Sequence, residues 1–338
     1  MAGSYHGFPV LHPDEAASQI HDGMTLGIGG FTDPGCPHAV PRALASRARQ
    51  LKAQNQPFSL RVLSGAEAGP SIDQVMAEAG AIRFRMPFQA EKASRAGINA
   101  ETIEFVDVHL SHVAQQLNEG LFGSIDVAIA EATEVTPQGQ VYLSTAIGNG
   151  PTILKLAKKV ILELNERHPK FVREVADIAY LPPPPHRKPI PIHGVLDRIG
   201  KSHVDLDPAK IIGVVHTNEK STRKAPRPTD AVTQRIAANV IRFFLEEIAS
   251  GRLPAEFLPV QAGVGNVSNA IMAELGRNTD LPPFSMYTEV FQDSCVDLMR
   301  SGRLLAASST ALTLSESKLQ EVYDNWEFFS PRVVLRPC

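Results

Sequence analysis

The feature that most constrains this 338-residue chain is an alternation of strand-like and helix-like segments from one end to the other. Apolar, β-prone runs with the length of a buried strand occur at residues 24–28, 59–63, 125–130 and 160–164. Segments of suitable size for helices or loops lie between them, beginning with a predicted helix over residues 37–51. Because parallel strands need such crossover connections, the pattern predicts an α/β fold with mainly parallel sheets.

The length of the chain and one polar segment predict two lobes. A chain of 338 residues is longer than one ordinary hydrophobic core requires. Residues 218–228 are polar, basic and interrupted by Pro226 and Pro228, as expected for a linker. We therefore expect a first lobe over residues 1–217, a linker over residues 218–228 and a second lobe over residues 229–338.

The clearest helix signal of the chain follows this linker. Thr229 or Asp230 is placed to cap the helix, and Gly251 is placed to end it. One apolar face is expected at helical spacing, formed by Val232, Ile236, Val240, Phe243 and Phe244. The alternation then resumes, with strands expected over residues 257–261, 285–290 and 304–308 and helices over residues 267–275 and 293–301.

The composition is that of a soluble globular protein, with 43% hydrophobic and 20% charged residues. The net charge of -3 and the pI near 6.4 provide no general attraction to nucleic acid or to an anionic membrane. An anionic ligand must therefore be held by local backbone N–H groups and a few basic side chains.

Targeting signals and cysteines point to the cytoplasm. Residues 1–13 have neither the basic and apolar regions of a secretory signal nor an Arg-rich amphipathic pattern. No run approaches the roughly 18 apolar residues of a membrane-spanning helix. Cys36, Cys295 and Cys338 are too few and too scattered for a disulfide framework or a zinc site.

A glycine-containing turn in the second half is the first candidate for ligand binding. Gly263 and Gly265 lie between a predicted strand and a predicted helix. Glycine lets the backbone approach a ligand, and the start of a helix offers unpaired N–H donors for a phosphate or an oxyanion. A turn that needs glycine only for packing is the alternative. The spacing Gly-x-Gly-x-x-Ser does not fit the dinucleotide-binding fingerprint.

Glu289 is the second candidate, because it lies in an apolar, β-prone stretch near the carboxyl end of a predicted strand. That end of an α/β sheet is where ligands bind. A buried carboxylate without a partner is costly, so Glu289 is expected either to pair with a cation or to act on a ligand.

These two segments resemble the class I coenzyme A transferases, in particular the branch of succinyl-CoA:acetate CoA-transferases and acetyl-CoA hydrolases. The resemblance rests on residues 257–267 (Phe-Leu-Pro-Val-Gln-Ala-Gly-Val-Gly-Asn-Val) and 286–293 (Met-Tyr-Thr-Glu-Val-Phe-Gln-Asp). It continues through residues 304–314, 327–329 and 333–337 and, in the first half, residues 22–27, 30–32, 85–89 and 197–200. It covers nearly the whole chain and implies two lobes of CoA-transferase type, with mainly parallel sheets flanked by helices.

The resemblance also implies a covalent mechanism. Glu289 matches the nucleophile of the family, and the CoA-binding loop is matched by Gly263, Val264, Gly265, Asn266 and Val267, with the Val264 N–H as oxyanion donor. The expected reaction moves CoA from acetyl-CoA or succinyl-CoA to a short carboxylic acid through a glutamyl-CoA thioester. Coenzyme A is then a substrate, and no cofactor or metal is expected. We expect no nucleic-acid or membrane partner, and either a homodimer or association with a missing C-terminal part.

Members of this family continue beyond the position of Cys338 with a Gly-Ile-Gly-Gly-Ser-Gly-Asp-Phe motif that supplies an opposing oxyanion donor. This motif is not found here. Residues 229–338 are therefore expected to be the N-terminal portion of an incomplete catalytic lobe, with residues 333–335 as a strand that lacks a following helix or partner strand. On this interpretation the chain is a fragment, a frameshifted product or half of a split enzyme, with low solubility and little turnover alone.

Three functions stay open: a CoA transferase, an acetyl-CoA hydrolase that uses the same glutamate, and an inactive fragment or subunit that only binds a ligand or partner.

Other candidate residues have simpler interpretations. His109 and His112 lack a third metal ligand nearby, and Cys295 is expected to be a small core residue. Lys220, Arg223, Lys224 and Arg227 are expected to be solvated linker residues, with contact to CoA phosphates as the alternative.

Overall fold

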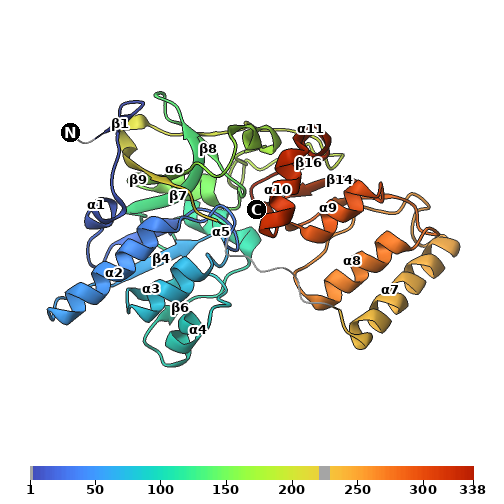
Figure 1. Cartoon of the computed structure of the whole chain (residues 1–338), viewed down its shortest axis with the longest axis horizontal. Coiled ribbons are helices and arrows are strands. Elements are labelled where there is room, and N and C mark those ends of the chain that lie inside the picture. Colours follow the sequence, from blue (N-terminus) through green and yellow to red (C-terminus); the bar gives the residue numbers. More distant parts are fainter. Residues whose placement is uncertain (1–2, 221–228) are drawn as a thin grey trace. The chain divides into compact units, whose positions relative to one another are not determined.

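The computed structural model describes residues 3–220 and 229–338. The chain divides into two compact units (Figure 1). Unit 1 is formed by residues 1–188, 200–222 and 337–338, and unit 2 by residues 189–199 and 223–336. Residues 189–199 therefore belong to unit 2, although the predicted boundaries placed them in the first lobe. Most of the predicted linker, 221–228, lies outside the described residues.

Unit 1 is built on one large sheet in the order β10-β8-β7-β3-β4-β5-β6, with β9 paired to β7 and β11 paired to β9. Its strands are β3 (Thr25–Ile28), β4 (Leu60–Ser64), β5 (Ile82–Met86), β6 (Glu104–Phe105), β7 (Val127–Val135), β8 (Gln140–Leu143), β9 (Lys159–Asn165), β10 (Val204–Asp205) and β11 (Ile211–Thr217). The pairings are parallel except for those of β8 with β7 and β10. A small hairpin of β1 (Ser4–Tyr5) and β2 (Phe8–Pro9) precedes this sheet.

Helices cover this sheet, as Figure 1 shows. They are α1 (Pro13–Ser18), α2 (Ala39–Ala53), α3 (Val75–Glu78), α4 (Lys92–Asn99), α5 (Leu110–Asn118) and α6 (Gly150–Leu156). Leu26 and Ile28 of β3 share one apolar core with Leu44 of α2. Gly27 faces Ile153 of α6, since a Cβ at Gly27 would lie 2.6 Å from the Ile153 side chain. Both faces of β3 are thus buried, which explains its continuous apolar sequence.

The order of the strands reverses between β3 and β7. From β3 the sheet grows through β4, β5 and β6, and from β7 it grows in the other direction through β9 and β11. Loops that leave the carboxyl ends of neighbouring strands diverge at such a point, which is where open α/β sheets bind ligands. Unit 1 therefore has a typical ligand-binding position of its fold class.

Unit 2 begins, after its segment 189–199, with two helices that pack on each other, α7 (Ala231–Ala249) and α8 (Asn266–Arg277). The following elements are β12 (Phe284–Tyr287), β13 (Val290–Gln292), α9 (Asp293–Arg300), β14 (Leu304–Ser309), β15 (Ala311–Thr313), α10 (Glu316–Asp324), α11 (Trp326–Phe329) and β16 (Val333–Leu335). Parallel pairing joins β12 to β14, β14 to β16 and β13 to β15. The predicted class, α/β with mainly parallel sheets flanked by helices, is confirmed.

The start of α7 is fixed by a reciprocal cap, as its sequence predicts. The Thr233 N–H donates to the Asp230 carboxylate at 2.8 Å, and the Asp230 N–H donates to the Thr233 hydroxyl at 3.0 Å. The predicted apolar residues of this helix are present at helical spacing, but they are not the ones that the helix buries. Thr233, Ala237 and Ile241 are the side chains that α7 buries, whereas Val232, Ile236 and Phe243 are exposed.

Three further expectations for unit 2 need correction. Residues 257–261 do not form a strand, because only Val260 makes a bridge, to Met286. The strand predicted over residues 285–290 is interrupted, so that Glu289 lies between β12 and β13. The strand at residues 333–335 has a partner, because β16 pairs with β14, which precedes it in the chain.

Within the described ranges, no helix combines the length and the apolar character that crossing a membrane requires.

Candidate active site

Glu289 stands at the carboxyl end of β12, where the chain passes from one small sheet of unit 2 to the next. Its backbone carbonyl accepts hydrogen bonds from the Thr310 N–H and the Ser309 hydroxyl, both at 3.0 Å. The preceding residue, Thr288, donates its N–H to the carbonyl of Ser308 at 2.9 Å. The backbone that carries Glu289 is therefore held by the strand beside it, as a residue that must be positioned accurately requires.

The carboxyl group of Glu289 has no such support. It is half-buried, and it makes no hydrogen bond or ion pair with any other described residue. Burial raises the pKa of Glu289, and within the described ranges neither a cation nor a hydrogen-bond donor opposes this effect. The protein thus holds this carboxylate in a partly desolvated position with no partner among the described residues.

The loop before α8 presents backbone donors rather than side chains. Gly265 caps the helix with φ 142°, a value that favours glycine, and no side chain caps the helix start. The N–H groups of Val264, Gly265 and Asn266 have no hydrogen-bond partner within residues 229–338. A Cβ built at Gly263 or Gly265 would meet no other atom within 4 Å, so the loop faces open space. Such a loop can accept an anionic oxygen.

Hydrogen bonds join this loop to the segment that carries Glu289. The Thr288 hydroxyl accepts from the Ala262 N–H at 3.3 Å and donates to the Ala262 carbonyl at 3.2 Å. The Gln292 amide donates to the Gly263 carbonyl at 3.2 Å. Residues on both sides of Glu289 therefore fix the position of the loop. The predicted loop, Gly263 to Val267, and the predicted nucleophile belong to one local structure, while their roles remain predictions.

A pocket of about 550 Å³ lies beside β12. Ser285 and Tyr287 of β12 line it together with Pro259, and the segment 189–199 closes it through Ile190, Ile192, His193, Gly194 and Val195. A buried ligand moiety commonly occupies a space of this size. Glu289 is not among the lining residues; it follows Tyr287 by two positions in the sequence.

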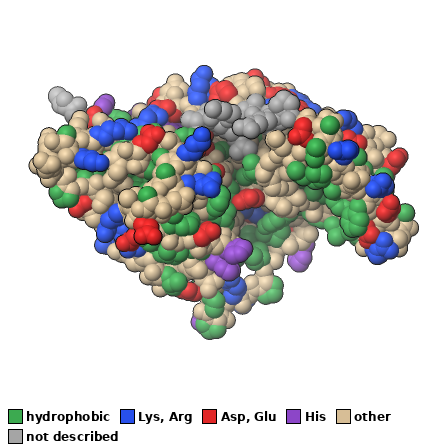
Figure 2. All heavy atoms as spheres, turned by 90° about the horizontal axis from the view of Figure 1, so that it is seen from below, with side chains coloured by type: hydrophobic (Ala, Val, Ile, Leu, Met, Phe, Trp, Pro, Cys, Tyr) green, Lys and Arg blue, Asp and Glu red, His purple; other side chains and the backbone are tan. Residues whose placement is uncertain are grey.

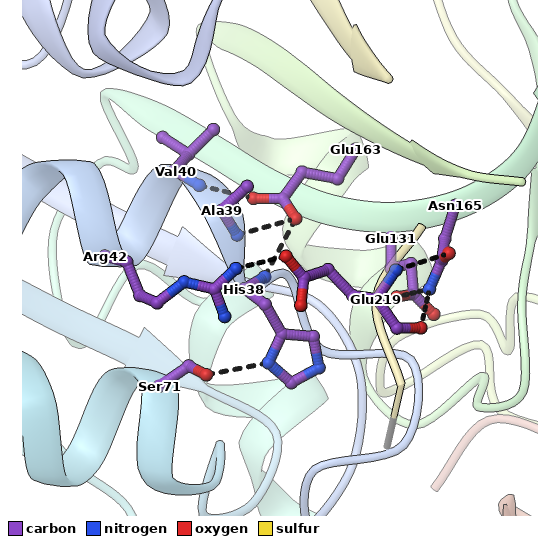
Figure 3. Close-up of polar contacts among 9 residues, drawn as sticks. All are labelled: His38, Ala39, Val40, Arg42, Ser71, Glu131, Glu163, Asn165 and Glu219. Atoms are coloured by element: carbon purple, nitrogen blue, oxygen red, sulfur yellow. Dashed lines mark hydrogen bonds and ion pairs between the residues drawn. The ribbon is translucent and has the colours of Figure 1, made fainter. Parts of the chain in front are cut away.

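Unit 1 contains buried carboxylates of a different kind, drawn in Figure 3. Glu163 of β9 accepts hydrogen bonds from the N–H groups of His38, Ala39 and Val40, at 2.8, 3.0 and 2.7 Å. These groups begin α2, so Glu163 caps that helix across the fold. The His38 ring in turn contacts the Ser71 hydroxyl at 2.8 Å. Every contact here completes the fold and leaves no reactive oxygen exposed.

Glu131 of β7 is the second partnered carboxylate of unit 1. It accepts hydrogen bonds from the Ser144 hydroxyl and, at 2.8 Å, the Asn165 amide, and it lies 3.3 Å from the His168 ring. Burial acts to raise the pKa of Glu131, but the contacts with His168, Ser144 and Asn165 outweigh it and lower the pKa. Asn165 also binds the backbone of Glu219 through both its amide atoms (Figure 3). We interpret this network as structural.

A third polar group of unit 1, at the carboxyl ends of β4 and β5, is incompletely satisfied. Arg85 is fully buried and pairs with Asp73 at 2.7 Å, but its Nη2 has no partner among the residues described. The same holds for Oε2 of Glu67, Oε1 of Gln89 and Oδ1 of Asn149. Burial, with Asp73 and Glu91, raises the pKa of Glu67 to about 6. These groups are suited to a polar ligand or to bound water.

Sequence reasoning did not single out this cluster. Arg85 lies in a β-prone run and Glu67 in a loop, and neither has a local pattern that marks it as buried. The sequence pattern that could have revealed this cluster is Arg85 between the apolar residues Phe84 and Met86. An arginine within a core strand requires an acidic partner, so this pattern indicates a buried polar group.

Other candidates have no support as sites. The rings of His109 and His112 lie 5.8 Å apart, and no group of three metal-binding side chains exists in the described part of the chain. Cys295 is buried against Met286, and burial raises the pKa of its thiol to about 11, so it is an unreactive core residue.

Comparison with known proteins connects this geometry to a family. Residues 7–216 match the family described as the acetyl-CoA hydrolase/transferase N-terminal domain. This range ends before the loop and Glu289, which lie in the part of the chain that only whole-chain similarity covers.

Two relatives illustrate that similarity. The propanoyl-CoA:succinate CoA transferase of Escherichia coli (strain K12) is 44% identical over 96% of this chain and 66% of its own length. An acetyl-CoA hydrolase of Schizosaccharomyces pombe is 35% identical over 97% of this chain and 65% of its own length. The chain therefore spans slightly less than two thirds of either relative.

The fold also has a counterpart among solved structures. The crystal structure of RipA from Yersinia pestis matches 97% of this chain and 68% of its own chain, with a TM-score of 0.67 and 19% identity. At this identity the likeness shows the fold alone.

Proposed function

The chain belongs to the acetyl-CoA hydrolase/transferase family, and on this premise we propose that it transfers coenzyme A between a short acyl-CoA and a short carboxylic acid. Acetyl-CoA or succinyl-CoA is the proposed donor. Glu289 is the proposed nucleophile, and the Val264 N–H is the proposed oxyanion donor. Coenzyme A is a substrate in this scheme, and neither a metal nor a further cofactor takes part.

One observation carries the proposal. Glu289 is a half-buried carboxylate without a partner among the described residues, and its flanking residues bind a loop whose N–H groups have no partner within residues 229–338. A nucleophile and an oxyanion donor are the two groups that acyl transfer requires close together.

The first step forms a mixed anhydride. A Glu289 carboxylate oxygen attacks the carbonyl carbon of the acyl-CoA thioester, and the carbonyl oxygen becomes an anion in the tetrahedral intermediate. The Val264 N–H stabilises this anion. The carbon–sulfur bond then breaks and CoA leaves as a thiolate, so that the acyl group is bound to Glu289. No base is needed, because a carboxylate is ionised near neutral pH.

The second step transfers CoA to the enzyme. The thiolate attacks the side-chain carbonyl of Glu289, and the original acid leaves as a carboxylate. Glu289 is now a CoA thioester. A second carboxylic acid reverses both steps and leaves with CoA, so that the activation of the acyl group is conserved. Removal of one oxyanion donor in comparable sites lowers the rate by about 10²–10³-fold.

Hydrolysis is the second candidate function. The family description includes hydrolases, and a relative with that name is 35% identical to this chain. Water would attack the same glutamyl intermediate in place of the acceptor acid. The relative named as a transferase has the higher identity, 44%, which favours transfer.

The test is to mix the protein with succinyl-CoA and labelled acetate, and to measure labelled acetyl-CoA and free CoA. We expect labelled acetyl-CoA as the main product, whereas free CoA alone would identify a hydrolase. Glu289→Ala should lower transfer by at least about 10³-fold, and Glu289→Asp should remove most of it, because the carboxylate is withdrawn by one methylene. Glu256→Ala, at an exposed glutamate of unit 2, is the matched control. Unchanged transfer by Glu289→Ala would refute the mechanism.

A further inference from the structure

Arg336, directly after β16, is a buried arginine of unit 2. Lys and Arg side chains are usually solvated, and Figure 2 shows many of them in blue on the surface of the molecule. Arg336 is only 6% exposed, and it is the one buried Lys or Arg side chain within residues 189–199 and 229–336. A buried guanidinium is costly to desolvate, and apolar residues fill such positions at lower cost. The contacts of this arginine therefore require an explanation.

The guanidinium of Arg336 joins two distant segments of unit 2. Its Nε donates to the hydroxyl of Ser308, near the carboxyl end of β14, at 2.7 Å. Its Nη2 donates to the backbone carbonyls of Val195, at 3.2 Å, and Asp197. These carbonyls belong to the segment 189–199 and lie 141 and 139 positions away in the sequence. A planar guanidinium can donate in two fixed directions at once, which a lysine ammonium cannot do.

The backbone of Arg336 continues the sheet at the level where the neighbouring strands are interrupted. β12 ends at Tyr287, two residues before Glu289, and β14 ends at Ser309. The Arg336 N–H donates to the Ser309 carbonyl at 2.7 Å, and the Arg336 carbonyl accepts from the Thr310 hydroxyl at 2.8 Å. Since β14 pairs with both β12 and β16, Arg336 lies at the same level of the sheet as the interruption that contains Glu289.

Two short chains of hydrogen bonds connect Arg336 to Glu289. In the first, the guanidinium binds the Ser308 hydroxyl, and the Ser308 carbonyl accepts from the N–H of Thr288 at 2.9 Å. In the second, the Arg336 N–H binds the Ser309 carbonyl, and the Ser309 hydroxyl donates to the Glu289 carbonyl at 3.0 Å. Both chains end on the backbone at Glu289 or beside it. Arg336 can therefore fix the place of this residue without contacting its carboxyl group.

We propose that Arg336 is a positioning residue for Glu289, a role that rests on the proposed CoA transfer. The Glu289 carboxyl group has no partner among the described residues, so its direction is set by the backbone that carries it. Displacement of a reacting group by about 1 Å can lower a rate by about 10²-fold. By tying Ser308 to residues 195–197, the guanidinium limits such a displacement.

Arg336→Lys is the first test, because it keeps the charge and the aliphatic stem but loses the double contact. We expect kcat for CoA transfer to fall by about 10–100-fold, with KM for the acyl-CoA changed by less than about 3-fold. A variant that only loosens the fold would keep kcat per folded molecule. Thermal melting of the variant and the parent gives the folded fraction.

Arg303→Lys is the matched control. Arg303 also binds backbone carbonyls of unit 2, those of Asn278 and Leu281, each at 2.8 Å, but it precedes β14 and lies at the other end of that strand. Its replacement should change kcat by less than about 2-fold at a temperature where the variant is folded. Equal losses of kcat in the two lysine variants would contradict a specific role of Arg336.

Ser308→Ala tests the first chain of hydrogen bonds. It removes the hydroxyl that Arg336 Nε binds and leaves the arginine in place. We expect kcat to fall by about 3–10-fold, and the double variant with Arg336→Lys should lose little more than Arg336→Lys alone, because both changes break one contact. Effects that multiply in the double variant would mean that Arg336 does not act through Ser308, and would overturn this route.

Hydrogen exchange provides a readout that does not depend on turnover. The Thr288 N–H donates to the Ser308 carbonyl, and the Thr310 N–H donates to the Glu289 carbonyl. Both amides should exchange about 10-fold faster in Arg336→Lys and at the parent rate in Arg303→Lys. Unchanged exchange would overturn the positioning role. So would the parent's kcat in Arg336→Lys when Glu289→Ala abolishes transfer, and the proposed function would then stand. Transfer retained by Glu289→Ala would instead refute the proposed function, and the positioning role with it.

Discussion

The starts of helices α2 and α8 make the two units of this protein directly comparable. Each helix follows a loop with glycine residues, and each has N–H groups that its own first turn does not use. In unit 1, Glu163 accepts from three of these groups at the start of α2 (Figure 3). In unit 2, the corresponding groups at the start of α8 have no partner among the described residues, and Glu289 on the neighbouring segment has none either.

The difference shows how to separate structural from functional carboxylates. A buried carboxylate that accepts all the donors around it stabilises the fold and has no oxygen left for chemistry. A carboxylate and a helix start that remain unpaired side by side cost stability, and that cost is retained where a ligand completes the site. We therefore propose that Glu163 and Glu131 serve stability and that Glu289 serves the reaction.

Of the two helix starts, the open one at α8 should show the larger effect on activity. Gly265→Val should lower CoA transfer by at least about 10²-fold, because a Cβ at φ 142° strains the backbone and blocks the approach of a ligand. Val264→Ala keeps the backbone N–H and should change transfer by less than about 3-fold. Steady-state rates of both variants, with melting curves as a control for folding, check this. Equal tolerance at the two positions would remove the loop from the mechanism.

At the start of α2, where Glu163 accepts the N–H groups, a substitution should change stability and not activity. Glu163→Gln replaces one accepting oxygen by an NH₂ group that faces backbone donors, so we expect the free energy of unfolding to fall by about 2–4 kcal/mol. Denaturant unfolding measures this loss. At a temperature where the variant is folded, its rate of CoA transfer should be close to that of the parent protein. A loss of activity without a loss of stability would contradict the assignment.

Glu131→Gln should have a somewhat smaller effect that depends on pH. The pKa of Glu131 is lowered in the fold, so its contribution is present above the unfolded pKa of about 4.3 and is lost as the pH falls through the folded pKa. We expect a loss of about 1–3 kcal/mol at neutral pH. The difference in the free energy of unfolding between variant and parent should become smaller as the pH is lowered. A difference that does not change with pH would be inconsistent with this network.

Glu289→Gln should show the smallest change in stability, and of opposite sign. The pKa of Glu289 is raised, so the fold favours its neutral form, and this contribution is present below the unfolded pKa and lost as the pH rises. Near neutral pH the variant should be as stable as the parent or more stable by less than about 1 kcal/mol, since solvent screens a half-exposed group. Denaturant unfolding of the variant and the parent at a series of pH values measures this difference in stability. Marked destabilisation would mean that Glu289 has a structural partner.

Local patterns were sufficient to predict much of unit 2. The cap of α7, the helix α8 and the strand β14 follow from turn residues and periodicity over short windows. Glu289 stood out for a local reason as well, as a carboxylate within an apolar run. The exposure of Val232, Ile236 and Phe243 on α7 could not be predicted, because periodicity identifies an apolar stripe and not what covers it.

The polar network of unit 1 could not be predicted in this way. Glu163 and His38 are 125 positions apart in the sequence, and Glu131 and Asn165 are 34 apart. Such contacts depend on the register of the sheet and on the placement of α2, which no local window contains. The same is true of the cluster around Glu67 and Arg85, whose members meet only through β4 and β5.

The central claim is that Glu289, and neither of the partnered glutamates, forms the covalent intermediate. The most direct measurement is to incubate the protein with acetyl-CoA, reduce it with borohydride, digest it and determine the masses of the peptides. A glutamyl-CoA thioester is reduced to an alcohol, so the account predicts this mass change at Glu289 and none at Glu131 or Glu163. Reduction at either of those residues, or CoA transfer without any modified glutamate, would contradict it.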